Sequence, residues 1–330
     1  MGITVAVTGP TGEIGISAVT ALEAAPGVDR ILGMARRPFH PSAHGWTRTE
    51  YRQGDILDRD AVDAFVAEAD VVVHLAFLIM GSREQSRRIN LDGTRNVFEA
   101  TVGAPRPHRL VYTSSVAAYG YHDDNPTPLT EDVAPRGSKE HYYSEQKAEC
   151  EQLLTELTAA SDLEVYVLRP CIVAGPRATM LADSMPWNQL LARLPVALRR
   201  AAVALRAVRP LLPDPGTPVQ LVHHDDVATA IVAAALGRGA PGPYNLAGDG
   251  QVSLRQVAEA VGARGVRVPR AAAVAASELL ARLPRVPAAA EWVHVARTSV
   301  VMDTGRAKRE LGWAPAYTSE QTLAAMAAAR

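Results

Sequence analysis

The sequence predicts an α/β fold of the Rossmann type, in which helices cover both faces of a doubly wound parallel sheet. Two observations carry this prediction. Short, nearly continuous apolar runs alternate with helix-like stretches in the first half of the chain, and a glycine-rich turn joins the first run to the first helix. Strands buried on both faces need apolar residues at successive positions, so continuous runs indicate a parallel sheet.

The apolar runs predict strands over residues 3–8, 30–35, 71–76, 110–114 and 165–169. The intervening stretches predict helices that include residues 14–25, 60–67 and 90–101. Strands that alternate with helices in this way are typical of crossover units that build a parallel sheet.

The composition changes after Pro170. The second half is rich in Ala, Leu, Arg and Pro, and strand-like runs recur there only at 219–222 and 244–246. We therefore expect a Rossmann domain over 1–170, onto which 217–247 fold back. The remainder of 171–330 is expected to form a smaller, mostly helical substrate-binding region.

Composition excludes several classes of protein. With 48% hydrophobic residues, 21% charged residues and a net charge of -1, the composition of the 330-residue chain gives no indication of a nucleic-acid partner. The two cysteines form no Cys-x-x-Cys motif, which favours a reducing, cytoplasmic compartment and argues against a structural metal. The chain start lacks the features of a signal peptide, and no uncharged stretch reaches the roughly 20 residues of a membrane span.

The glycine-rich turn has the pattern Gly-x-x-Gly-x-x-Gly at Gly9, Gly12 and Gly15. A turn from a strand into a helix needs a residue that tolerates unusual φ angles, and close approach of a phosphate to the backbone needs residues without a Cβ. The free N–H groups at the start of the helix then attract the anion. The turn therefore predicts a site for the pyrophosphate of a dinucleotide.

Residues 8–15, TGPTGEIG, resemble the TGxxGxxG motif of the short-chain dehydrogenase/reductase superfamily. Asp55-Ile56 resembles the acidic-aliphatic pair that contacts adenine in this superfamily, and His74-Leu75-Ala76 resembles the HxA of its extended members. Asn90 matches the helix asparagine of those members, and Arg169-Pro170 with Gly175-Pro176 resembles their RPxxVxGP segment. The resemblance is to the extended members, the NAD-dependent epimerase/dehydratase family, and covers essentially the whole chain.

The second expected strand runs into Ala35-Arg36-Arg37, where NAD-specific relatives usually carry an acidic residue. Guanidinium groups pair with phosphate through charge-assisted, bidentate hydrogen bonds. We therefore expect NADP(H). The alternative is NAD(H), with the arginines as surface charges or one of them stacked on the adenine.

The catalytic candidates are Ser115, Tyr143 and Lys147. Tyr143 and Lys147 form Tyr-x-x-x-Lys at the start of a helical stretch, so they share a helix face. A lysine ammonium near a phenol favours the phenolate and lowers the tyrosine pKa, which lets tyrosine act as acid or base. The resemblance implies that Lys147 also binds the nicotinamide ribose, and that Ser115 hydrogen-bonds the substrate oxygen.

The turn and the resemblance together assign eighteen positions to the dinucleotide. They are Gly9, Thr11, Gly12, Glu13, Ile14, Gly15, Arg36, Arg37, Asp55, Ile56, Leu75, Ala76, Asn90, Thr113, Tyr143, Lys147, Pro170 and Val173.

No metal site is expected. Residues 222–228 resemble the HVDDVA segment of the family and place His223 and His224 beside two aspartates. Neighbouring residues on a strand point to opposite faces, so these side chains are not expected to converge on one ion. An aspartate before the helical run is interpreted as a helix N-cap.

The expected reaction is hydride transfer between the nicotinamide and a carbonyl or alcohol carbon of a small hydrophobic substrate. Nucleotide-sugar dehydratases carry Asp-Glu after the catalytic strand, and this chain has Val116-Ala117 there, which cannot move a proton. Cys171-Ile172 stands where epimerases tend to carry an asparagine, and Met180, Met185 and Trp187 are available to line an apolar pocket.

Two alternatives stay open. The first is a nucleotide-sugar epimerase with tightly bound NAD, whose substrate diphosphate would be held by Arg193, Arg199 and Arg200. The second is a dinucleotide-binding regulator without turnover. The resemblance also implies a homodimer, for which the apolar positions Val97, Leu153, Leu154 and Leu157 suit an interface as well as they suit the core.

Overall fold

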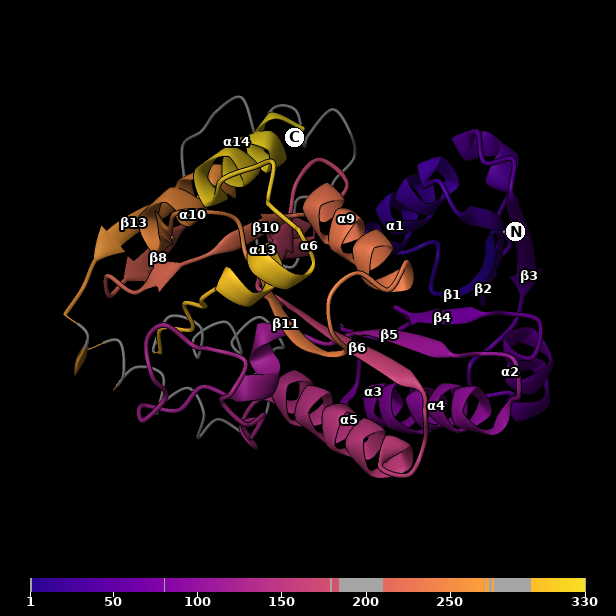
Figure 1. Ribbon diagram of the computed structural model, residues 1–330. Coiled ribbons are helices and arrows are strands. Elements are labelled where there is room, and N and C mark those ends of the chain that lie inside the picture. The colour runs from indigo at the N-terminus through magenta and orange to yellow at the C-terminus, as the bar shows by residue number, and fades with distance from the viewer. Residues whose placement is uncertain are drawn as a thin grey trace.

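The computed structural model describes residues 2–79, 81–178, 180–183, 210–269, 271–272, 275 and 298–329. A seven-stranded sheet forms its centre, and every neighbouring pair of its strands is parallel (Figure 1). In spatial order the strands are β11 (Gly242–Leu246), β6 (Glu164–Pro170), β5 (Arg109–Thr113), β4 (Val71–His74), β1 (Ile3–Thr8), β2 (Val28–Ala35) and β3 (Thr49–Gln53). The chain winds outward from β1 in both directions, which confirms the predicted fold.

Helices cover both faces of the sheet. On one face lie α1 (Glu13–Ala24) and α9 (His224–Ala235), and on the other lie α2 (Arg59–Val66), α4 (Thr94–Gly103) and α5 (Tyr142–Thr158) (Figure 1). Successive residues of β1 divide between the two cores: Val5 and Val7 pack with α1 and α9, whereas Ala6 packs with the opposite layer. This division explains why the strands are continuously apolar.

Strand β3 was not expected. Its sequence, Thr-Glu-Tyr-Arg-Gln, is polar because the strand forms the edge of the sheet. There Glu50 and Glu68 each form ion pairs with both Arg30 and Arg52. Charged side chains on an edge strand discourage pairing with another chain.

The expected helix over 90–101 is divided in the structure. A short helix α3 (Arg83–Arg87) runs into a π-helical turn, η2 (Arg88–Gly93), before α4 begins. Two 3₁₀ turns complete this half, η1 (Pro41–His44) and η3 (Val116–Tyr119). The π-helical turn places Asn90 beneath the loop after β4, which the site uses.

After Pro170 the described residues also form further helices and three two-stranded sheets; the expected strand over 219–222 lies in these small sheets, and their other strands were not predicted. The helices are α6 (Met180–Asp183), α10 (Leu254–Ala260), α13 (Gly305–Glu310) and α14 (Ser319–Ala328). The sheets pair β7 (Ile172–Ala174) with β10 (Leu221–His223), β9 (Pro218–Val219) with β12 (Val252–Ser253), and β8 (Leu211–Asp214) with β13 (Arg264–Arg267). Strands of two to four residues are too short to show a periodicity.

The longest helix of the described residues is α5, with 17 residues. No helix in that part of the chain combines the length and apolarity that crossing a bilayer would need.

Candidate active site

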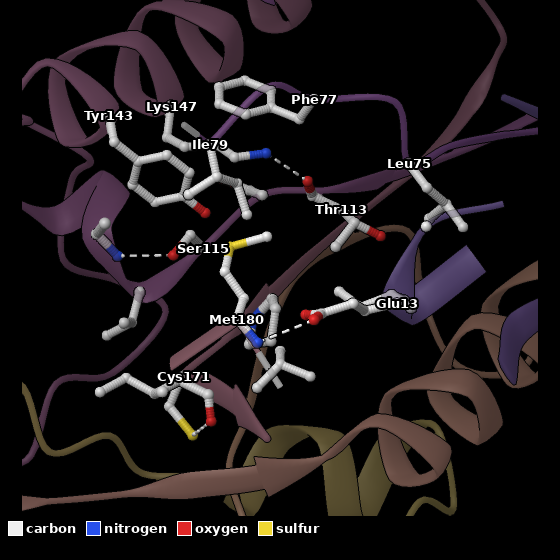
Figure 2. Close-up of a pocket in the computed structure, with 18 of the residues that line it drawn as sticks. Glu13, Leu75, Phe77, Ile79, Thr113, Ser115, Tyr143, Lys147, Cys171 and Met180 are labelled. Atoms are coloured by element: carbon white, nitrogen blue, oxygen red, sulfur yellow. Dashed lines mark hydrogen bonds between the residues drawn. The ribbon is translucent and has the colours of Figure 1, made fainter. Parts of the chain in front are cut away.

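A cavity of about 290 Å³ opens at the carboxyl ends of β1, β5 and β6. Figure 2 shows Ser115, Tyr143 and Lys147 on one side of it and Glu13 and Leu75 on the other. Of the positions assigned by sequence, the structure brings these to the wall: Gly9, Gly12, Glu13, Ile14, Gly15, Leu75, Thr113, Ser115, Tyr143, Lys147, Pro170 and Val173. The glycine turn and the catalytic candidates therefore face one another across a single cavity.

The glycine turn is fixed by its own backbone. Gly9 has φ +74°, and a Cβ on Gly15 would lie 2.1 Å from the Gly9 carbonyl oxygen, so side chains are excluded at both positions. Gly12 differs, because a Cβ there would approach only the same oxygen, at 3.5 Å. Gly12 is therefore open toward the cavity, and it caps α1 without a side-chain hydrogen bond to the helix N–H groups.

This arrangement fits the pyrophosphate of a dinucleotide. An uncapped helix N-terminus offers N–H donors and a positive partial charge to an anion. A second observation lies across the cavity, where the Thr113 hydroxyl is buried without a hydrogen-bond partner in the described residues. A buried hydroxyl without a partner is unfavourable, and a polar group of a bound ligand would satisfy it.

Helix α5 presents Tyr143 and Lys147 to the cavity from its first two turns. His141 caps the helix through its Nδ1, which accepts a hydrogen bond from the Ser144 backbone N–H at 3.2 Å. The Ser115 hydroxyl oxygen, at the start of η3, accepts a hydrogen bond from the Ala117 backbone N–H at 3.1 Å. With its oxygen held by that N–H, Ser115 can direct its own proton toward a group in the cavity.

Lys147 is buried, with 3% of its surface exposed. Its ammonium donates a hydrogen bond to the Thr113 carbonyl oxygen at 2.8 Å and lies 3.7 Å from the centre of the Phe77 ring. Burial lowers the pKa of Lys147 to about 8, against the opposing influence of Cys150 and Glu151. The ammonium form is therefore held in place by a carbonyl and an aromatic face.

The pKa of Tyr143 departs from the expectation. Burial raises the pKa of Tyr143, and the neighbouring Ser115 hydroxyl only partly offsets this. The Lys147 ammonium lies 5.9 Å from the centre of the Tyr143 ring and directs its hydrogen bond to Thr113 instead. The predicted lowering by Lys147 is therefore not the dominant effect, because desolvation of the phenol is stronger.

Seven assigned positions lie outside the cavity wall: Thr11, Arg36, Arg37, Asp55, Ile56, Ala76 and Asn90. Thr11 lies within the glycine turn, and Ala76 packs against Gly9. Arg36 and Arg37 are exposed at the end of β2. Asp55 accepts a hydrogen bond from the Leu57 N–H, and Ile56 is buried against Gly93.

Asn90 connects the loop after β4 to α5. Its side-chain oxygen accepts a hydrogen bond from the Leu78 N–H at 2.7 Å, and its amide donates to the Leu78 carbonyl at 2.9 Å and to Gln146 at 2.8 Å. Asn90 therefore fixes the loop that carries Phe77. Its side-chain amide donates both of its hydrogen bonds within the protein, one to this loop and one to α5.

The His74 side chain is buried and forms polar contacts within the protein. Its Nδ1 lies 2.7 Å from the Thr8 hydroxyl and its Nε2 lies 3.0 Å from the Thr94 hydroxyl. Burial, with a contribution from Lys147, lowers the pKa of His74 to about 3, so the ring is neutral.

Sequence reasoning missed several residues of the cavity wall. The wall also includes Phe77, Ile79, Ser114, Tyr121, His141 and Tyr142. Phe77 and Ile79 continue the apolar run of β4, and His141-Tyr142 directly precede Tyr143, but only the tertiary structure shows which face they present. Met180, expected as a pocket residue, does line the wall, and its N–H donates a hydrogen bond to the Glu13 carboxylate at 2.9 Å (Figure 2).

His223, His224 and Asp225 correct one expectation. Their ligand-type atoms lie within 4.8 Å of one another, because the chain changes from β10 to α9 between His223 and His224. Hydrogen bonds already engage these groups: His224 Nε2 accepts from the Arg177 N–H, while His224 Nδ1 contacts Ser17 and Asp225. The helix N-cap is His223 rather than an aspartate.

The chain is similar to several known proteins in sequence and in fold. An uncharacterized protein of Sinorhizobium fredii, y4nG, is 26% identical over 294 residues, which are 86% of this chain and 69% of that protein. Rv2047c of Mycobacterium tuberculosis is 29% identical over 97% of this chain, which spans only 29% of that protein. The structure of MoeE5 in complex with UDP-glucuronic acid and NAD has a TM-score of 0.72 at 22% identity, covering 99% of this chain and 98% of that one.

A family model matches residues 5–247, from the first strand through the last strand of the large sheet. This range includes the glycine turn, Ser115 and the Tyr143-Lys147 pair. The chain belongs to the NAD dependent epimerase/dehydratase family.

Proposed function

We propose that the protein is an NADP(H)-dependent oxidoreductase that acts on a carbonyl or alcohol carbon of a small hydrophobic substrate. One observation supports this most directly: Ser115, Tyr143 and Lys147 line the same cavity as the glycine turn. A proton donor, a hydroxyl and a buried cation thus stand opposite a site suited to an anionic cofactor.

The bound dinucleotide would supply the hydride for reduction or accept it in oxidation. In the reductive direction the Tyr143 hydroxyl gives its proton to the substrate oxygen, while the Ser115 hydroxyl donates a hydrogen bond to the same atom. The Lys147 ammonium lies 5.9 Å from the centre of the Tyr143 ring, so its charge would offset only part of the desolvation cost of the phenolate that Tyr143 leaves behind. In the oxidative direction Tyr143 takes the proton back.

The proposed substrate class is supported by the substrate side of the wall. Phe77, Ile79, Val116, Ala117 and Ile172 are apolar, and they leave few groups that could pair with a charged substrate. Lys147 is the only lysine or arginine among the described residues of the wall. This apolar lining supports a neutral, hydrophobic carbonyl compound as the substrate. Arg193, Arg199, Arg200, Met185 and Trp187 lie outside the described residues.

The preference for NADP(H) is supported by Arg36 and Arg37. Both are exposed at the end of β2, and neither forms an ion pair with a carboxylate in the described part of the chain. Two unpaired guanidinium groups would attract the additional phosphate of NADP(H).

A cytoplasmic location is also proposed. Cys150 and Cys171 are both buried free thiols, as a reducing compartment permits. The homodimer stays a prediction, since Val97, Leu153 and Leu154 are buried in the protomer's own core and Leu157 packs against that core.

The test pairs binding with turnover. Thermal unfolding is measured with NADPH and with NADH, and the purified protein is then screened against hydrophobic ketones, aldehydes and nucleotide sugars. We expect greater stabilisation by NADPH and consumption of NADPH with the hydrophobic carbonyls. Release of tightly bound NAD on denaturation, together with turnover of a nucleotide sugar, would instead identify an epimerase.

A further inference from the structure

The turn that carries Arg36 and Arg37 is held by side chains of the neighbouring edge strand, β3. The Tyr51 hydroxyl donates a hydrogen bond to the Ala35 carbonyl oxygen at 2.8 Å and also contacts the Arg37 carbonyl oxygen. The Gln53 amide donates to the Arg36 carbonyl oxygen at 2.9 Å. Three successive carbonyls are therefore engaged by two side chains, which is more than pairing of the two strands requires.

The guanidinium groups of Arg36 and Arg37 are not paired with the carboxylates of the neighbouring sheet edge. Arg30 pairs with Glu50 at 2.5 Å and with Glu68 at 3.1 Å, and Arg52 pairs with the same two carboxylates. The two glutamates are thus occupied. In the described part of the chain no carboxylate forms an ion pair with the guanidinium of Arg36 or Arg37.

The turn also lies beside the phosphate-binding glycines. The Gly9 N–H donates a hydrogen bond to the Met34 carbonyl oxygen at 2.9 Å, and a Cβ on Gly33 would lie 3.1 Å from the Pro10 ring. The end of β2 is therefore joined directly to the glycine turn. In doubly wound folds the residues after this strand meet the ribose of the adenosine half.

We propose that Tyr51 and Gln53 determine cofactor specificity by fixing the backbone of the arginine turn, so that Arg36 and Arg37 form a preordered receptor for the 2′-phosphate of NADP(H). This inference rests on the proposed function. Preordering matters because a flexible turn would lose conformational freedom on binding the phosphate, which weakens affinity. Tyr51 and Gln53 contact the phosphate only through the turn, so they are positioning residues.

The test measures dissociation constants for NADPH and NADH by calorimetry, without turnover. Tyr51→Phe removes the hydroxyl and keeps the ring, which packs 5.5 Å from the Phe39 ring centre. Gln53→Met removes the amide donor at similar size and is an independent second variant. Loss of one hydrogen bond is expected to weaken NADPH binding about fivefold and to leave NADH binding unchanged. Arg52→Lys is the matched control, since it alters a side chain of the same strand, keeps a positive charge beside Glu50 and Glu68 and does not touch the turn, and it is expected to preserve the ratio of the two affinities.

The outcomes separate the inference from the proposed function. An unchanged ratio in both Tyr51→Phe and Gln53→Met, or equal weakening of both cofactors, overturns the positioning role. If an Arg36→Gln, Arg37→Gln double variant loses the preference for NADPH in that case, the NADP(H) assignment still stands. Tighter binding of NADH by the unaltered protein overturns the assignment and this inference together.

Discussion

Lys147 is a lysine in a buried environment, which disfavours its charged form. Its ammonium is buried between the Thr113 carbonyl and the Phe77 ring, and burial lowers its pKa from 10.5 to about 8. The Tyr-x-x-x-Lys spacing predicted which residues share a helix face, but it could not predict these contacts, because Thr113 and Phe77 come from other strands and loops. The same limit explains why the direction of the Tyr143 pKa was predicted wrongly.

The buried ammonium predicts a specific dependence of stability on pH. The folded pKa lies below the unfolded one, so the unfavourable contribution is complete below pH 8 and disappears as pH rises toward 10.5. Lys147→Met is therefore expected to raise the free energy of unfolding at pH 7 by up to about 3 kcal/mol, an advantage that shrinks between pH 8 and 10.5. Urea unfolding at several pH values measures this, and a gain independent of pH would show that packing, not charge, is responsible.

Two glycines of the turn, Gly12 and Gly15, predict different responses to one added methyl group. Gly15→Ala places a Cβ 2.1 Å from a backbone oxygen, so the turn must distort and the protein is expected to lose stability. Gly12→Ala meets nothing closer than 3.5 Å, yet it projects where the pyrophosphate would approach. We expect Gly12→Ala to unfold normally and bind dinucleotide at least tenfold more weakly, by calorimetry. Normal dinucleotide binding by Gly12→Ala would show that the glycine turn does not bind the pyrophosphate.

At the scale of elements, helix α5 connects the active site to the sheet through a buried ion pair. Glu151 lies one turn beyond Lys147 and pairs with Arg169 at 2.6 Å, and it accepts a hydrogen bond from the Ser114 hydroxyl. The side chains of Glu151 and Arg169 are only 6% and 4% exposed. These contacts fix α5 against the strand ends that precede Ser115 and Pro170.

The same helix offers a matched comparison of buried and exposed carboxylates. Glu151→Gln leaves Arg169 as an unpaired buried charge and is expected to lower the free energy of unfolding by about 3 kcal/mol or more. Glu149→Gln breaks the more exposed pair with Arg87, at 3.2 Å, and is expected to lower it by less than about 1 kcal/mol. Denaturant unfolding of the two variants checks the prediction; equal losses would mean that the Glu151 pair contributes no more than a surface contact.

Elements with strong local signals were predicted correctly, and those defined by tertiary context were not. The strands β1 and β5 differ from the expected ranges by at most one residue at each end, because their apolar runs are bounded by polar turns. Strand β3 was missed since its polar edge sequence has no apolar run. The convergence of His223 and Asp225 depends on a change from strand to helix inside one short motif, which periodicity does not resolve.

At the scale of the whole molecule, the parallel sheet brings residues that are distant in sequence together at the carboxyl ends of its strands. Gly9 and Ser115 come after the ends of two strands and Pro170 ends a third, and the common direction of those strands brings them to the same cavity. Right-handed crossovers limit the possible strand orders, and the glycine turn and the family resemblance indicated which residues meet, so this half of the site could be predicted. The substrate side could not, because its wall comes from loops and short strands without regular patterns.

Turnover by the unaltered protein and by Tyr143→Phe, followed as the change in NADPH absorbance with a panel of hydrophobic ketones and nucleotide sugars, tests the central proposal most directly. We expect the unaltered protein to oxidise NADPH with hydrophobic ketones. Tyr143→Phe should lose this activity by at least two orders of magnitude while retaining its thermal stabilisation by NADPH. Equal turnover by Tyr143→Phe, or conversion of a nucleotide sugar without net oxidation of NADPH, would contradict the proposed reaction.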